Sequence, residues 1–122
     1  MSLTGQRKIL LMNSHSREGV YVTPAMGIFK VAEFARNRGI DCDILDYDID
    51  DDSEFIKNAE RGEYAVIAMS VTHYQMEADL ERLWMFRKCA EKSGYPVIIA
   101  GGGQEAAMNY EQWLDAALNV VF

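Results

Sequence analysis

Three consecutive glycines, Gly101 to Gly103, follow the short apolar run 97–100 and are the residues best suited to accommodate a ligand. Glycine has no Cβ atom, so a bulky ligand can approach the main chain closely where a strand ends. One glycine is usually enough for a tight turn between a strand and a helix. The run of three therefore favours a ligand-binding loop, and a plain turn is the alternative.

Two polar segments carry the other groups that could bind a ligand. The first follows the apolar run 8–12 and is longer than most connections between a strand and a helix. Its candidates are Asn13, Ser14, His15, Ser16 and Tyr21. The second follows the apolar run 64–69 and offers Ser70, Thr72 and His73. These groups are neutral and form hydrogen bonds, which suits a large ligand bearing amides better than one bearing several phosphates.

Known phosphate-binding motifs are absent from the first segment. It contains neither GxxxxGK[ST] nor GxGxxG, so it is neither a P-loop nor a dinucleotide fingerprint. A loop that binds flavin mononucleotide stays open as an alternative, although the hydroxyl groups are dispersed.

Short apolar runs alternate with amphipathic helical patterns along the chain. The predicted strands are 8–13, 40–45, 64–70, 97–100 and 118–122, and the predicted helices are 24–38, 53–61, 76–93 and one that begins near Asn109. Residues expected on the buried faces are Ile28, Val31, Phe34 and Ala35 in the first helix, and Met76, Leu80, Leu83 and Trp84 in the third. The alternation predicts a three-layer α/β fold of flavodoxin-like (Rossmann-like) type. Its parallel five-stranded sheet should have the order 2-1-3-4-5, with the candidate residues at its carboxyl edge.

Composition narrows the classes of partner. The 122 residues are enough for one domain, and the formal net charge is −7 with no cluster of Lys or Arg. Neither nucleic acid nor an anionic membrane surface is therefore an expected partner. Cys42 and Cys89 are isolated and are interpreted as buried thiols in a reducing, cytoplasmic setting. The acidic stretch 46–52 is interpreted as solvated, not as a metal site.

The order and spacing of these segments resemble the cobalamin-binding domain at the N-terminus of many radical-SAM enzymes. The stretches that carry the resemblance are KILLMNS, VAEFARNRGIDCDILD, YAVIAMSVT, VIIAGGG and LNVVF, and the resemblance spans nearly the whole chain. The resemblance implies that the dimethylbenzimidazole tail of cobalamin inserts between the sheet and a helix. Ser70, Thr72 and Gly101 to Gly103 would line that slot, and the corrin would rest on the sheet edge.

One departure concerns the cobalt ligand. Cobalamin proteins of the methionine synthase and mutase type carry Asp-x-His-x-x-Gly in the first loop, and this His coordinates cobalt. Here Asn13 replaces the Asp and Gly19 comes one position late, so the carboxylate that would orient His15 is missing. The resemblance makes His15 a possible lower ligand of cobalt, and a solvated loop histidine is the alternative.

The expected role follows from the same resemblance. The chain contains no CxxxCxxC motif and cannot itself ligate an iron–sulfur cluster. We interpret residues 1–122 as one cobalamin-binding domain of a longer protein, whose downstream catalytic domain would use an iron–sulfur cluster and S-adenosylmethionine. Two alternatives are a stand-alone corrinoid carrier for methyl transfer and a flavodoxin-like docking module without cofactor. A phosphorylated receiver domain is rejected, because strand 64–70 ends in Met-Ser instead of aspartate.

Overall fold

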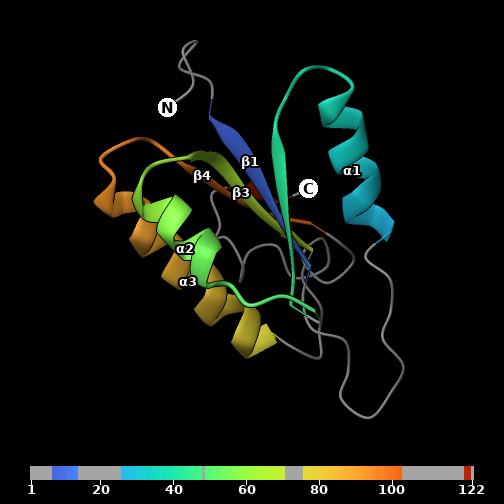
Figure 1. Cartoon of the computed structure of the whole chain (residues 1–122). Helices are drawn as coiled ribbons and strands as arrows, with labels where there is room; N and C mark the ends of the chain where they lie inside the picture. Colours follow the sequence, from blue (N-terminus) through green and yellow to red (C-terminus); the bar gives the residue numbers. More distant parts are fainter. Residues whose placement is uncertain (1–6, 14–25, 48, 71–75, 103–119, 122) are drawn as a thin grey trace.

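The computed structural model describes residues 7–13, 26–47, 49–70, 76–102 and 120–121 (Figure 1). Five parallel strands form one sheet in the predicted order, β2-β1-β3-β4-β5. The elements are β1 (Lys8–Asn13), α1 (Met26–Arg36), β2 (Cys42–Asp46), α2 (Ser53–Glu60), β3 (Tyr64–Ser70), α3 (Met76–Lys92), β4 (Ile98–Gly102) and β5 (Val120–Val121). Predicted and observed bounds differ by two residues at most. The predicted helix near Asn109 lies outside the described residues.

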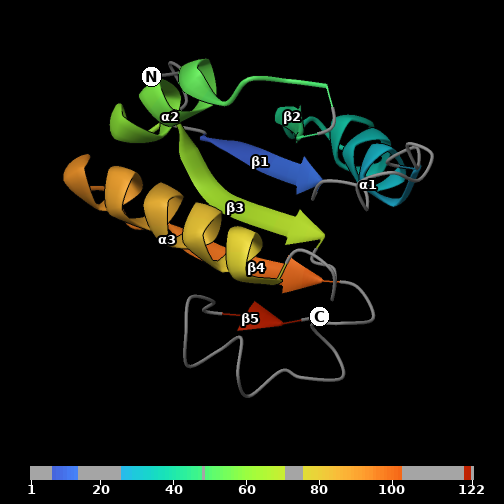
Figure 2. The ribbon, with the colours of Figure 1, turned by 90° about the horizontal axis from the view of Figure 1, so that it is seen from below.

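The sheet separates two apolar cores. α1 lies on one face, and α2 and α3 lie side by side on the other (Figures 1 and 2). The strand residues that face α2 and α3 include Leu10, Met12, Ile67, Met69 and Ile99. Those in the core with α1 include Leu11, Ala68 and Ala100. Because successive residues point to opposite faces and both faces are covered, the strands read as nearly continuous apolar runs. None of the described helices is long and apolar enough to cross a membrane.

The prediction of which side chains α1 buries was half wrong. Ile28 and Ala35 are buried, but Val31 and Phe34 are 51% and 58% exposed. The buried position between them is Ala32, which is fully inaccessible. Positions 28, 32 and 35 follow the i, i+4, i+7 spacing of one helical stripe, so the sheet contacts this narrow stripe and leaves the two larger side chains on its flank.

Trp84 on α3 was also wrongly assigned to the core. Its side chain is 47% exposed, while Leu83 and Phe86 are fully buried. Both buried residues share a stripe with Ala90 and with Asp79, a carboxylate in the first turn of the helix. Trp84 lies about 100° around the helix from Leu83, which turns it away from the sheet.

The two thiols differ in burial. Cys42 is buried as predicted, but Cys89 is only partly buried, so the prediction of a buried thiol was wrong there. Burial is the main cause that raises the pKa of both thiols above the ordinary value. Neither cysteine is therefore activated as a nucleophile.

Three glycines, Gly39, Gly62 and Gly94, follow helices in a left-handed conformation, and only Gly62 is crowded. Gly39 follows α1 with a φ of +79°, and Gly62 follows α2 with a φ of +77°. A Cβ atom added at Gly39 would meet nothing within 4 Å. The same atom at Gly62 would lie 2.5 Å from Cδ2 of Tyr95. Gly62 is thus required both by its backbone conformation and by close packing.

A buried tyrosine ties the start of β3 to its neighbours. The hydroxyl of Tyr64 donates a hydrogen bond to Oδ2 of Asp43 at 2.8 Å and accepts one from Nδ2 of Asn58 at 3.3 Å. Burial is the largest cause that raises the pKa of Tyr64 far above its usual range, and Asp43 acts in the same direction. This network joins α2, β2 and β3 near the amino edge of the sheet.

Candidate functional site

The parallel register brings four residues into one line at the carboxyl edge of the sheet. Asn13 on β1 pairs with Asp46 on β2 and with Ser70 on β3, and Ser70 pairs with Gly102 on β4. We call Asp46, Asn13, Ser70 and Gly102 the edge row. Because the loops after parallel strands meet at this edge, the row marks the place where an α/β sheet binds ligands.

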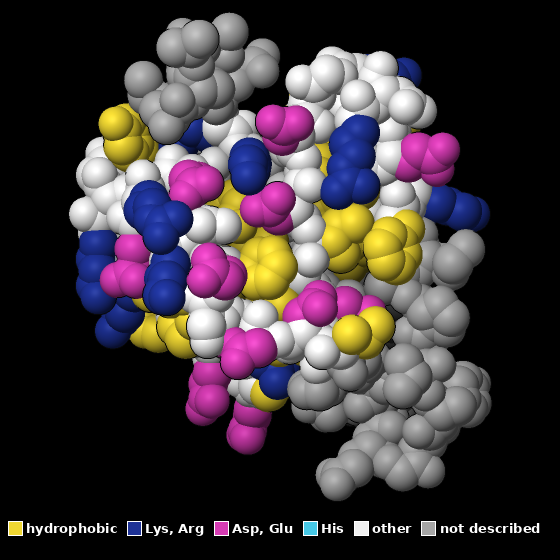
Figure 3. All heavy atoms as spheres, in the orientation of Figure 1, with side chains coloured by type: hydrophobic (Ala, Val, Ile, Leu, Met, Phe, Trp, Pro, Cys, Tyr) yellow, Lys and Arg dark blue, Asp and Glu magenta, His cyan; other side chains and the backbone are white. Residues whose placement is uncertain are grey.

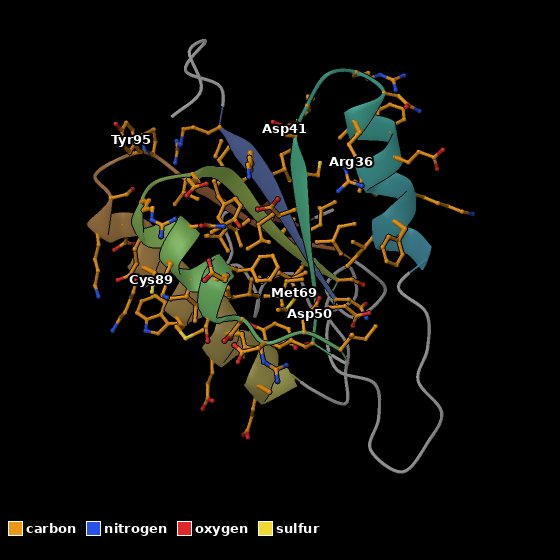
Figure 4. All side chains as sticks on the ribbon, in the orientation of Figure 1. Arg36, Asp41, Asp50, Met69, Cys89 and Tyr95 are labelled. Carbon is orange, nitrogen blue, oxygen red and sulfur yellow. The ribbon has the colours of Figure 1, made fainter. Side chains whose placement is uncertain are left out.

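The β2 end of the edge row is held by hydrogen bonds. Nδ2 of Asn13 donates to Oδ1 of Asp46 at 3.4 Å, and the N–H of Tyr47 donates to the carbonyl of Asn13 at 3.2 Å. The N–H of Asp46 donates to Oδ2 of Asp50 at 3.0 Å, and the N–H of Asp50 donates back to the carbonyl of Asp46 at 2.7 Å. Figure 4 shows Asp50 and Met69 near this end of the sheet. The chain is therefore held in a fixed turn as it leaves β2.

Asp46 departs from the interpretation of the acidic stretch as solvated. Its side chain is only 6% exposed, although Asp50 and Asp51 are exposed as expected. The interpretation failed at this residue because Asp46 is still part of the parallel ladder with β1. Within the described residues, no group of His, Cys, Asp and Glu could hold a metal ion.

A second buried carboxylate lies on α3, and the sequence pattern did not predict it. Asp79 is fully buried and pairs with Arg82 at 3.5 Å. The guanidinium of Arg82 lies 4.0 Å from the centre of the Tyr47 ring, and the Tyr47 hydroxyl donates to Oδ2 of Asp52 at 3.0 Å. Burial is the largest cause that raises the pKa of Tyr47, and its bond to Asp52 adds to it.

This chain of contacts joins α3, the end of β2 and the start of α2. It supports the edge row from the α3 side. The i, i+3 spacing of Asp79 and Arg82 was the only signal of it in the sequence, and such pairs are common on exposed helical faces.

The structure brings together those predicted site residues that it describes. Asn13, Ser70, Gly101 and Gly102 lie at the carboxyl ends of three adjacent strands, and both glycines are buried. The other predicted site residues lie outside the described residues, and they are Ser14, His15, Ser16, Tyr21, Thr72, His73 and Gly103. Their roles stay predictions.

The chemistry of the edge favours a ligand that is large and mostly uncharged. It offers an amide, a hydroxyl and glycine backbone, together with the carboxylate of Asp46. The acidic side chains visible in Figure 3 are interspersed with Lys and Arg, and the chain carries a net charge of −7. A polyphosphate would meet a carboxylate here, whereas the amide groups of a corrin could form hydrogen bonds along the row.

Comparison with known families decides the kind of ligand. The sequence model of the family described as "B12 binding domain" matches residues 17–122. This chain belongs to the B12-binding domain family. The predicted resemblance to a cobalamin-binding domain and the predicted fold are both confirmed. No curated protein matches the chain.

The match begins after His15 and includes the rest of the sheet from α1 onward. Membership of the family supports cobalamin as the ligand of this domain. The neutral donors and the two buried glycines fit this group, since they combine hydrogen-bonding capacity with backbone that carries no Cβ atom where a flat ring system needs close approach.

Proposed function

We propose that this B12-binding domain holds cobalamin over the edge row and presents it to a catalytic domain. The observation that carries the proposal is the register that lines up Asn13, Ser70 and Gly102 on adjacent strands. In the proposal, Gly101 to Gly103 and Thr72 extend the Ser70 side, and Ser14, Ser16, Tyr21 and His73 contact the corrin from the loops. Cobalamin, when bound, supplies a cobalt centre for methyl transfer or radical chemistry.

The proposed catalytic domain is of the radical-SAM type and would lie downstream in a longer protein. The order of the motifs in the sequence supports this context, because that arrangement resembles the N-terminal domain of such enzymes. The iron–sulfur cluster and S-adenosylmethionine would then belong to the other domain. A stand-alone corrinoid methyl carrier is the second candidate, and a docking module without cofactor is the third.

The cobalt ligand distinguishes the first two candidates. A carrier with a working Asp-x-His-x-x-Gly motif would use His15 as the lower ligand, with a carboxylate to orient it. Asn13 occupies the position of that carboxylate, and its amide donates to Asp46. An amide cannot stabilise an imidazolium as a carboxylate does, which favours the radical-SAM context over the carrier.

A visible absorption spectrum after incubation with hydroxocobalamin and desalting tests cobalamin binding. We expect the wild-type chain to retain the corrin spectrum and Gly102→Val to lose it, because a branched side chain would fill the edge where the ring must approach. Ser93→Ala is the control for a substitution away from the edge row, since Ser93 is half-buried and lies beyond the far end of α3. Its retention should equal that of the wild type.

The outcomes separate the candidates. Retention by a folded Gly102→Val variant would contradict the proposed site, and no retention by the folded wild type would favour the docking module. In the retained complex, His15→Ala should leave the spectrum unchanged if cobalt has no protein ligand. A spectral shift in that variant would identify His15 as the lower ligand and favour the methyl carrier.

A further inference from the structure

β2 is an edge strand of the sheet. β1 pairs with one side of it, and among the described residues no strand pairs with the other side, which we call the β2 edge (Figure 2). An edge strand presents N–H and C=O groups that can pair with a strand of another molecule. The condition of these groups therefore decides whether a second copy of the chain can pair with β2.

Two backbone hydrogen bonds show which residues of β2 point away from β1. The N–H of Ile9 donates to the carbonyl of Asp41 at 3.0 Å, and the N–H of Tyr47 donates to the carbonyl of Asn13 at 3.2 Å. N–H and C=O groups alternate in direction along a strand, so the odd-numbered residues of β2 bond to β1. The residues that present their backbone groups at the β2 edge are Cys42, Ile44 and Asp46.

A side chain of α1 caps the carbonyl at the start of the β2 edge. Nη2 of Arg36 donates to the carbonyl of Cys42 at 2.8 Å. Figure 4 shows Arg36 reaching from the last turn of α1 toward this strand. A guanidinium has several donors and no acceptor, so it caps a carbonyl without continuing the ladder. A strand of a second molecule would have to displace Arg36.

The turn after β2 caps the groups at the other end of the β2 edge. The N–H of Asp46 donates to Oδ2 of Asp50 at 3.0 Å. The carbonyl of Asp46 accepts from the N–H groups of Ile49 and Asp50, at 3.0 and 2.7 Å. A carbonyl oxygen has two lone pairs, and both are used here. Neither backbone group of Asp46 can therefore pair with an added strand while this turn is formed.

The two caps block most of the bonds that two β2 strands could form with each other. In a symmetric antiparallel pair centred on Ile44, Cys42 of each copy would face Asp46 of the other. Each facing pair of outward residues would exchange two hydrogen bonds. The caps block both pairs of Cys42 with Asp46 and leave the central pair of Ile44 residues. One such pair is too little to hold two strands together, since even a complete two-stranded hairpin is marginally stable in water.

We propose that Arg36 and Asp50 close the β2 edge and so prevent a second copy of this chain from pairing with it. The two capping side chains are exposed and come from opposite ends of the strand, one from α1 and one from the turn after β2. Their charges are opposite, so they cap the edge without adding net charge. The inference goes beyond the proposed function, because all of these bonds are formed within the chain and none involves cobalamin.

Sedimentation velocity of the chain at several concentrations tests the proposal. We expect the dissociation constant for self-association to be about tenfold or more lower in the double variant Arg36→Ala with Asp50→Ala than in the wild type. Arg38→Ala with Asp51→Ala is the matched control. It removes the same two charges from neighbouring exposed residues, whose side chains bond to Phe34 and Ser53 instead of β2. The control should behave like the wild type.

A pair of conservative substitutions separates capping from charge. In hydrogen exchange, the amide of Asp46 should exchange about tenfold or more faster in Asp50→Ala but at about the wild-type rate in Asp50→Asn, because the side-chain carbonyl of asparagine can still accept the bond. Arg36→Lys with Asp50→Asn should likewise associate no more than the wild type, since lysine can still donate to the carbonyl of Cys42.

Three outcomes would overturn the proposal. The first is a folded double alanine variant that associates no more than its matched control. The second is association of Arg36→Lys with Asp50→Asn as strong as that of the double alanine variant. The third is association of the wild type that Arg36→Ala abolishes, because Arg36 would then join two copies instead of keeping them apart. Hydroxocobalamin retention by the wild type is measured separately, so failure here is distinct from failure of the proposed function.

Discussion

Replacing Asn13 by aspartate would place a second carboxylate beside Asp46. The wild-type amide donates to Oδ1 of Asp46 at 3.4 Å, and Asp46 is 6% exposed. Asn13→Asp keeps the shape of the side chain, removes this donor and restores the residue of the Asp-x-His-x-x-Gly motif. We expect this substitution to destabilise the protein, because β2 already supplies a carboxylate at that place.

The expected loss of stability follows from the distance between the two carboxylates. Two unit charges about 4 Å apart repel by roughly 4 kcal/mol at an effective dielectric constant of about 20. Asn13 is half-buried, so solvent reduces this to about 2–3 kcal/mol. The repulsion raises the pKa of the folded pair above that of the unfolded chain. The cost is therefore absent below a pH of about 4, where the carboxyls are protonated, and grows as the pH rises through the raised pKa of the pair.

Urea denaturation at several pH values measures the effect, since urea does not screen charge. Asn13→Asp should lose about 2–3 kcal/mol of unfolding free energy relative to Asn13→Ala at pH 7, and the gap should close as the pH falls toward 4. Asn13→Ala is the control, because it removes the same hydrogen bond without adding charge. The exchanged double variant, Asn13→Asp with Asp46→Asn, should recover most of the loss.

Two results would refute this reasoning. If the gap between Asn13→Asp and Asn13→Ala did not change with pH, the cost would not be electrostatic. If the exchanged double variant were no more stable than Asn13→Asp, residues 13 and 46 would not be coupled, and Asp46 could not explain why an amide stands at position 13.

Three further predictions concern the fold that carries the site. Gly62→Ala should lower the free energy of unfolding by about 1–3 kcal/mol more than Gly39→Ala, measured by thermal or urea unfolding. Both variants put alanine in a left-handed conformation, but only the new Cβ atom at position 62 would lie 2.5 Å from an aromatic ring atom. Folding raises the pKa of Tyr64, so its contribution to the unfolding free energy is complete below the unfolded pKa of about 10 and is lost as the pH rises through the folded pKa. In Tyr64→Phe, the unfolding free energy should therefore fall less steeply with pH above about 10 than in the wild type. Equal slopes for wild type and variant in alkaline unfolding would contradict this. Phe86→Ala should cost about 3–5 kcal/mol, whereas Trp84→Ala, at 47% exposure, should cost less than about 1 kcal/mol.

The topology was predictable because the local signals agreed. Apolar runs of strand length alternate with amphipathic helices, and glycines with positive φ end the helices where the pattern stops. Burial on individual helices was harder to predict. Periodicity predicts which side of a helix is apolar, but it does not predict which residues of that side contact the sheet. The prediction that Val31 and Phe34 are buried was therefore wrong, because the sheet contacts only the stripe that contains Ala32.

The sequence predicted where the candidate site lies but not all of the residues that form it. Strand ends and the rule for open α/β sheets located Asn13, Ser70 and the glycines at one edge, and the register confirms this. Asp46 and Asp79 could not be identified in the same way. Aspartates are usually exposed, and the burial of these two depends on neighbours that are distant in sequence.

The edge row changes what the departure from the histidine motif means. When the sequence is compared with the motif residue by residue, position 13 has lost its carboxylate. In three dimensions the carboxylate is still present at the same edge, supplied by Asp46 on β2 and bonded to the amide that replaced it. A second negative charge there would be repelled, so asparagine is the residue that this arrangement requires. The pH series on Asn13→Asp thus tests whether the negative charge of this edge limits the stability of the fold. Together with the spectrum of His15→Ala, it also tests whether that charge orients a cobalt ligand.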